Sequence, residues 1–114
     1  MNVTIWHNGA CSKSNAALAY LEEKNLNINI LNYLEDTPSV EEIEDFLKLS
    51  CMKAKELFRS SEALYEELNI SAIVDEKELI ALLNAHATLI QRPVIITKDA
   101  AVLARPFSKL SALI

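Results

Sequence analysis

The chain has 114 residues, of which 51% are hydrophobic and 24% charged, and its net charge is −5. This composition indicates one globular domain with a buried core, and no apolar run approaches the roughly 20 residues that span a bilayer. The acidic balance argues against nucleic-acid binding, which needs basic surfaces. The first residues also lack the basic and apolar regions of a signal peptide. We therefore expect a cytoplasmic monomer without a membrane or nucleic-acid partner.

The first third of the chain predicts a strand, a helix and a second strand. Residues 2–7 (NVTIWH) are β-branched and aromatic, and residues 27–34 (NINILNYL) alternate between apolar and polar side chains. Between them, residues 13–24 carry apolar side chains at helical spacing, and Asn25 is a plausible stop. Such a βαβ unit predicts two parallel strands joined by a right-handed crossover.

The middle of the chain has a helical pattern. Ser39 and Glu42 form a capping-box sequence ahead of one apolar-periodic stretch, and Asp75 opens a later one. Two shorter helices are expected between these two, over residues 52–58 and 63–68.

The last part of the chain predicts a hairpin and a helix. Residues 93–97 (PVIIT) and 101–105 (AVLAR) are apolar strands separated by a short turn, and Pro106 suits the first turn of a C-terminal helix. The order β-α-β, helices, β-β-α is that of an α/β, thioredoxin-like fold with a mixed four-stranded sheet. We expect a single domain, residues 1–114, with a helical insertion over about 39–86.

One of the two cysteines, Cys11, lies where the first strand gives way to the first helix. The first turn of a helix has unpaired N–H groups and a partial positive charge, which stabilise a thiolate. The preceding loop is expected to add N–H donors, with Gly9 widening its conformational range. His7 and Lys13 are expected to add positive charge. These features favour a nucleophilic thiol, and the alternative is a small buried cysteine that packs as an apolar side chain.

The residues that follow read CSKS, so the loop lacks the second cysteine of a C-x-x-C dithiol. Any thiol that resolves Cys11 therefore comes from elsewhere, while Ser12 and Ser14 add hydroxyl groups. Cys51, at the start of an expected helix, is more simply a structural cysteine. The cysteines and histidines, including His86, lack paired ligand spacing, so no metal site is expected.

The chain has only three arginines, Arg59, Arg92 and Arg105. Arginine is the residue of choice where a planar fork binds an oxyanion through two hydrogen bonds. An acidic protein that captures an anion must gather its cations locally, which makes these three positions candidates. The alternative is a surface ion pair with a carboxylate, for example between Arg59 and Glu62.

Five motifs, in order along nearly the whole chain, resemble the glutaredoxin-coupled arsenate reductase family of the thioredoxin superfamily. They are HNGACSKS, YLEDTPS, LFRSSE, LIQRPVIIT and ARP. The resemblance implies that the loop cysteine is catalytic, that the three arginines hold an oxyanion, and that the peptide bond before Pro93 is cis and faces the cysteine. The expected catalytic residues are Cys11, Arg59, Arg92 and Arg105, and the expected substrate-binding residues are His7, Asn8, Ser12, Lys13, Ser14 and Pro93.

The activity implied by this resemblance is the reduction of arsenate to arsenite, with glutathione as co-substrate and glutaredoxin as protein partner, and without a bound cofactor or metal. This chain is a short member of that family. Gly9 stands where the family usually has proline, and we expect this replacement to loosen the loop. Two alternatives stay open: a thiol oxidoreductase acting on another substrate, and an Spx-type regulator that binds RNA polymerase. Ser14 occupies the place of the second cysteine in the Spx switch, which disfavours a disulfide switch of that kind.

Overall fold

The computed structural model describes residues 1–114 and divides into two units. The first unit contains residues 1–36 and 92–114, and the second unit contains residues 37–91. The second unit is therefore inserted into the first along the chain. None of the helices has the length and apolar character needed to cross a bilayer.

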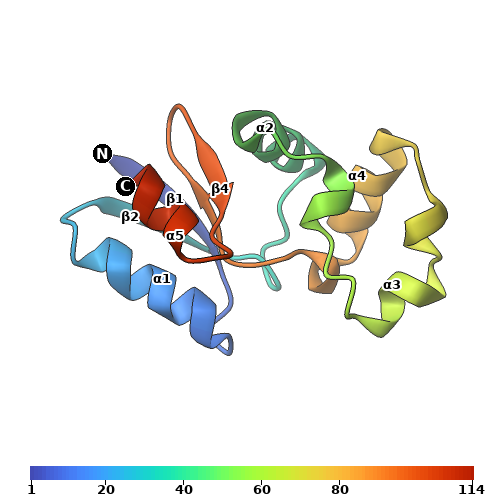
Figure 1. Cartoon of the computed structure of the whole chain (residues 1–114), viewed down its shortest axis with the longest axis horizontal. Helices are drawn as coiled ribbons and strands as arrows, with labels where there is room; N and C mark the ends of the chain where they lie inside the picture. The colour runs from blue at the N-terminus through green and yellow to red at the C-terminus, as the bar shows by residue number, and fades with distance from the viewer. The chain divides into compact units, whose positions relative to one another are not determined.

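The strands of the first unit form one mixed sheet in the order β2-β1-β3-β4. They are β1 (Asn2–His7), β2 (Asn27–Asn32), β3 (Val94–Ile96) and β4 (Ala101–Leu103). β1 pairs parallel with β2 and antiparallel with β3, and β4 pairs antiparallel with β3 (Figure 1). These pairings confirm the predicted βαβ unit, the hairpin and the mixed four-stranded sheet.

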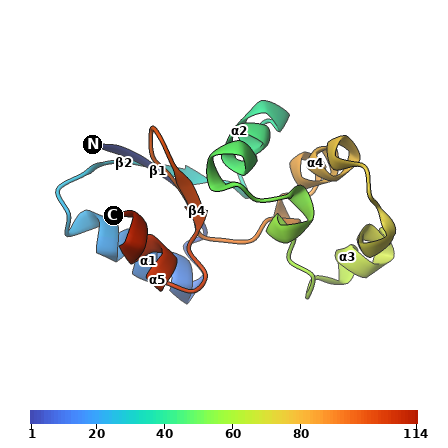
Figure 2. The same ribbon diagram turned by 45° about the horizontal axis from the view of Figure 1, so that its top comes forward.

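Two helices of the first unit, α1 (Ser12–Glu22) and α5 (Ser108–Leu113), lie on the same side of the sheet (Figures 1 and 2). α1 ends before the expected stop: its C-cap is Glu23, and Asn25, with φ of 55°, lies in the turn that leads on to β2. The helices and strands bury a shared apolar core made of Val3, Ile5, Ala17, Leu21, Ile95, Ala104 and Leu110. This core fixes the start of α1 beside the carboxyl end of β1.

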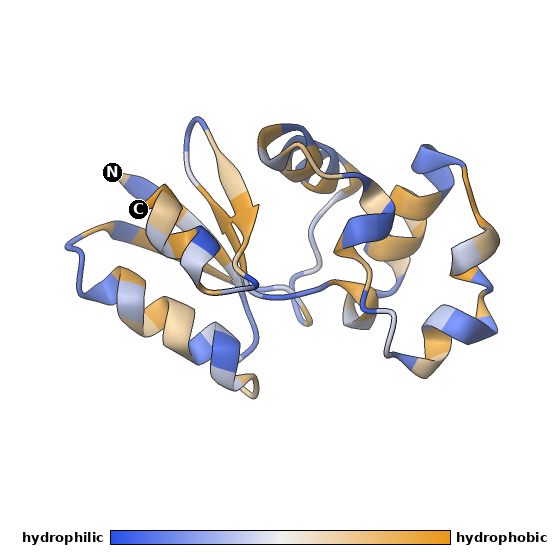
Figure 3. Cartoon of the chain, viewed as in Figure 1, coloured by the Kyte–Doolittle hydropathy of each residue, from blue (hydrophilic) through white to orange (hydrophobic).

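The hairpin between β3 and β4 closes through its turn residues. The Thr97 N–H donates to the carbonyl of Ala100 at 2.8 Å, and the Thr97 hydroxyl donates to the same carbonyl at 3.0 Å. Figure 3 shows a hydrophilic tip between two apolar strands. The alternation of apolar strand and polar turn in the sequence thus corresponds to the observed hairpin.

The second unit is helical. It contains α2 (Val40–Ser50), α3 (Ala63–Glu67) and α4 (Glu76–Ala85), with 3₁₀ turns at Ala54–Leu57, Ile70–Ala72 and Ala87–Leu89. The predicted capping box is present: the Glu42 N–H donates to Ser39 Oγ at 3.1 Å, and the Ser39 N–H donates to Glu42 Oε1 at 3.0 Å.

Two expectations about helices are wrong. The stretch 52–58 forms only a 3₁₀ turn, because Cys51 ends α2 in the left-handed conformation (φ 59°) and Lys53 is extended. Cys51 therefore closes a helix rather than opening one. Pro106 precedes α5 instead of lying in its first turn, and its carbonyl accepts the N–H of Lys109 at 3.0 Å.

Candidate active site

The loop between β1 and α1 places Cys11 at the N-cap of α1, in an extended conformation. The Cys11 N–H donates to the carbonyl of Asn8 at 3.0 Å, which closes a tight turn. The Asn15 side chain, in the first turns of α1, donates to the carbonyl of Gly9 at 2.9 Å. These bonds tie the loop to the helix and hold a free, half-buried thiol at the helix start.

The buried side chain of Ser14 forms hydrogen bonds with the same loop. It is fully buried, its Oγ accepts the N–H of Asn8 at 3.1 Å, and it is hydrogen-bonded to His7 Nδ1 at 2.7 Å. The polar contact of His7 is thus with Ser14. The Asn8 side chain in turn accepts the N–H of Ala10 at 3.0 Å. Three N–H groups of the loop are therefore bonded within the loop and its helix, so the expectation that they face the thiol is wrong.

Gly9 does not need the freedom of a glycine. Its φ is not positive, and a Cβ built there would have His7 Nε2, at 4.0 Å, as its nearest neighbour, which is an ordinary van der Waals distance. The loop therefore does not use the wider conformational range that was expected of Gly9, because its φ lies outside the left-handed region that favours glycine.

The pKa of the Cys11 thiol is lowered by its surroundings. Burial is the largest single effect and raises this pKa, but it is outweighed by hydrogen bonds from the Ser14 N–H, the Arg92 side chain and the Lys13 N–H, together with the charge of Arg92. The helix start thus contributes as predicted. The positive charge comes from Arg92, whereas the sequence had indicated His7 and Lys13.

Arg92 lies directly before β3, and the peptide bond that joins it to Pro93 is cis, as expected. Burial lowers the pKa of its guanidinium, but the interactions with Cys11 and with Tyr33 outweigh burial and raise it. Tyr33 is fully buried directly after β2 and was not predicted as a site residue. A signal for it existed, because the carboxyl ends of the parallel strands β1 and β2 share one edge of the sheet.

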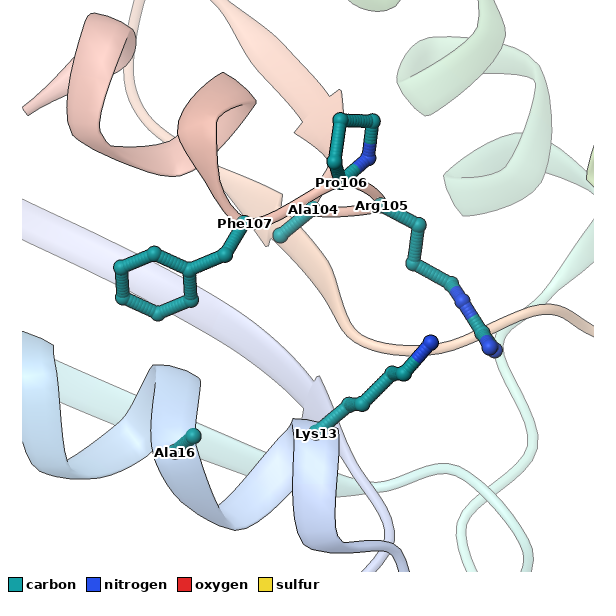
Figure 4. A pocket seen from close by; sticks show the side chains of 6 residues that line it. All are labelled: Lys13, Ala16, Ala104, Arg105, Pro106 and Phe107. Carbon is teal, nitrogen blue, oxygen red and sulfur yellow. The ribbon is translucent and has the colours of Figure 1, made fainter.

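A pocket of about 410 Å³ adjoins the start of α1 (Figure 4). In this view the ammonium group of Lys13 and the guanidinium of Arg105 reach toward one another, while the ring of Phe107 lies at the other end. Arg105 Nη1 also donates a long hydrogen bond, 3.5 Å, to the carbonyl of Arg92. The full lining consists of Lys13, Ala16, Ala104, Arg105, Pro106 and Phe107. The first unit therefore brings Cys11 together with Arg92, and it places two further cations, Lys13 and Arg105, at the adjoining pocket.

The remaining candidates differ in their contacts. Ser12, the first residue of α1, is exposed. Arg59 belongs to the second unit, where it forms an ion pair with Glu62, the alternative that the sequence had left open. Cys51 also lies in the second unit, as an exposed free thiol. No group of three or more histidine, cysteine, aspartate or glutamate side chains is arranged to hold a metal ion.

This sheet order, together with a cysteine of lowered pKa at the start of α1 and a cis-proline before β3, defines a thioredoxin-like protein with a single site cysteine. The chain belongs to the ArsC family, whose sequence model matches residues 6–113.

Several relatives match nearly the whole chain. The arsenate reductase of Neisseria meningitidis is 32% identical over 114 residues, which cover 98% of this chain and 97% of the relative. The arsenate reductase of Haemophilus influenzae is 36% identical over 108 residues, with 93% of each chain covered. Among solved structures, the arsenate reductase of Vibrio cholerae has a TM-score of 0.94 at 33% identity, with 100% of this chain and 98% of that one covered.

Proposed function

We propose that this protein is an oxidoreductase that reduces arsenate to arsenite through an adduct between Cys11 and arsenic, with glutathione as the second thiol and glutaredoxin as the partner that restores Cys11. The observation that carries the proposal is the Cys11 thiol, whose pKa is lowered by the start of α1 and by Arg92. Membership of the ArsC family and the relatives named arsenate reductases support the choice of substrate.

The charges around Cys11 suit an oxyanion. Arsenate is mostly a dianion near neutral pH, and the chain as a whole carries a charge of −5, which repels it. Arg92, beside the thiol, and Arg105, which donates to the Arg92 carbonyl, supply local positive charge. Guanidinium groups bind such an oxyanion through two charge-assisted hydrogen bonds, and this local charge opposes the repulsion of the whole chain.

The chemistry follows from a thiolate held next to bound arsenate. The sulfur of Cys11 forms a bond to arsenic, and one arsenate oxygen takes up protons and leaves as water. The sulfur of glutathione then attacks the adduct. Two electrons from the two sulfurs pass to arsenic, which leaves as arsenite, and the sulfurs remain joined as a mixed disulfide. Thiol exchange with glutaredoxin returns Cys11 to its reduced state.

A lowered thiol pKa serves two of these steps. It places more of Cys11 in the nucleophilic thiolate form at neutral pH, which favours the attack on arsenic. It also makes Cys11 the better leaving group when glutaredoxin attacks the mixed disulfide, because a thiol of lower pKa leaves faster. The backbone N–H groups of Lys13 and Ser14, in the first turn of α1, contribute to this lowered pKa.

The test is arsenite formation by purified protein supplied with arsenate, glutathione and glutaredoxin. We expect turnover by the wild type, none by Cys11→Ser, and little without either glutathione or glutaredoxin. Cys51→Ser, which removes the exposed thiol of the second unit, is the matched control and should turn over normally. Folded protein that makes no arsenite but reduces a glutathione mixed disulfide through Cys11 would favour the thiol oxidoreductase with another substrate.

A further inference from the structure

Tyr33 and Arg92 are far apart in the sequence but lie at the same edge of the sheet. Leu31 of β2 and Val94 of β3 both pair with Trp6, near the carboxyl end of β1. Tyr33 lies two residues after Leu31, and Arg92 lies two residues before Val94, so both continue past the end of β1. Two strand spacings, or about 10 Å, separate such positions, which a tyrosine and an arginine side chain together can bridge.

The polar groups of these two side chains are buried. Tyr33 is fully buried, and both its hydroxyl oxygen and Arg92 Nε are closed to solvent. The Arg92 guanidinium interacts with this hydroxyl and with the Cys11 thiol. Because a guanidinium has only donors, the oxygen of Tyr33 is the acceptor in the first of these interactions. One part of the guanidinium is thus held by Tyr33, while another part meets Cys11.

The acceptor that holds Arg92 is a hydroxyl and not a carboxylate. A tyrosine hydroxyl ordinarily ionises only near about pH 10, so at neutral pH it accepts from a guanidinium without cancelling its charge. Arg59, in the second unit, shows the contrast, because it forms an ion pair with the carboxylate of Glu62. A carboxylate in place of the Tyr33 hydroxyl would compete with the Cys11 thiolate for the charge of Arg92. The phenol therefore suits an arginine whose charge is used elsewhere.

We propose that Tyr33 is a positioning residue for Arg92. Its hydroxyl accepts from one side of the guanidinium and so fixes the direction in which the remaining N–H groups meet the Cys11 thiolate and a bound oxyanion. A guanidinium that is already oriented loses less side-chain freedom when the anion binds. The role toward the oxyanion rests on the proposed function, whereas the role toward the thiolate does not depend on any substrate.

The first test is the thiolate titration of Cys11, followed by ultraviolet absorbance in Cys51→Ser protein. Tyr33→Phe removes the hydroxyl and keeps the ring, and it should raise the midpoint by at least about 0.3 pH units, because Arg92 is then held less well against the thiolate. In protein that also carries Arg92→Met, Tyr33→Phe should leave the midpoint unchanged. Tyr65→Phe, the matched control, removes a tyrosine hydroxyl in the second unit and should not move the midpoint.

The second test is steady-state kinetics with arsenate. Tyr33→Phe should lower kcat/KM at least about threefold, and this loss should disappear when Arg92→Met is also present. Tyr65→Phe should keep the kcat/KM of the wild type. Thermal melting checks that each variant is folded. If Tyr33→Phe does not fold, Tyr33→Met, which also lacks the hydroxyl but adapts more easily to a buried site, replaces it in both tests.

A purely structural role for Tyr33 predicts a lower Tm with the thiol midpoint unchanged. That result, or a midpoint shift of equal size with and without Arg92→Met, would overturn the proposal. Normal arsenate turnover and an unchanged midpoint in folded Tyr33→Phe protein would refute the positioning role and leave the proposed function standing. If the wild type makes no arsenite but the midpoint shift depends on Arg92 as expected, the proposed function fails while the positioning role stands.

Discussion

Removing the hydroxyl of Ser14 should destabilise the protein more than its small size suggests. Ser14 is fully buried, and its Oγ accepts the N–H of Asn8 and is hydrogen-bonded to His7 Nδ1. Ser14→Ala leaves both of these groups without a partner. A net hydrogen bond contributes about 1 kcal/mol, and a buried group left unpaired costs about 1–3 kcal/mol. Because both bonds are only partly buried, we expect a total loss of about 2 kcal/mol.

The assay is thermal and denaturant unfolding followed by circular dichroism. For a chain of this length, about 2 kcal/mol corresponds to a fall in Tm of about 6–12 °C. Ser12→Ala is the matched control, because Ser12 is exposed in the same helical turn and gains the same helix propensity from alanine. It should change the free energy of unfolding by no more than about 0.5 kcal/mol. Equal stability of Ser14→Ala and Ser12→Ala would refute the view that Ser14 holds the loop together.

Three further predictions concern single positions. Arg92→Lys should lower kcat/KM for arsenate reduction at least about tenfold in steady-state kinetics, which corresponds to about 1.4 kcal/mol. Lysine keeps the positive charge but lacks the planar guanidinium that interacts with both Cys11 and Tyr33. Gly9→Ala should raise the free energy of unfolding by about 0.4–1 kcal/mol in denaturant titrations, because its φ is not positive and a Cβ there meets no clash; a loss of stability would contradict this. Cys51→Ser should retain full turnover with external thiols, and loss of turnover in folded protein would instead indicate an internal disulfide with Cys11.

Much of the fold could be predicted because its signals are local. Alternating side chains marked β1 and β2, and the Ser39–Glu42 pair marked the start of α2 by a contact within one helical turn. The missed features depend on the surrounding structure. Nothing near Cys51 in the sequence indicates its left-handed conformation, and the apolar spacing of residues 52–58 fits a helix as well as the single 3₁₀ turn observed.

The candidate site likewise has features that the sequence predicts and features that it does not. Cys11 at a helix start follows from the change of pattern between β1 and α1, which the sequence displays directly. The interaction of the Cys11 thiol with Arg92 does not follow from the sequence, because Arg92 reaches Cys11 only through the pairing of β3 with β1. The bonds of the loop N–H groups depend on how the turn closes and on the buried side chain of Ser14, so a sequence pattern could not assign them.

The central claim is that Cys11 is a thiolate nucleophile prepared by the start of α1 and by Arg92. The most direct test follows the ultraviolet absorbance of the thiolate against pH in Cys51→Ser protein, where Cys11 is the only thiol. We predict a midpoint below the ordinary cysteine value of about 8.5, and a higher midpoint when Arg92→Met is added. A midpoint at or above about 8.5 in the Cys51→Ser protein would contradict the assignment of Cys11 as the nucleophile.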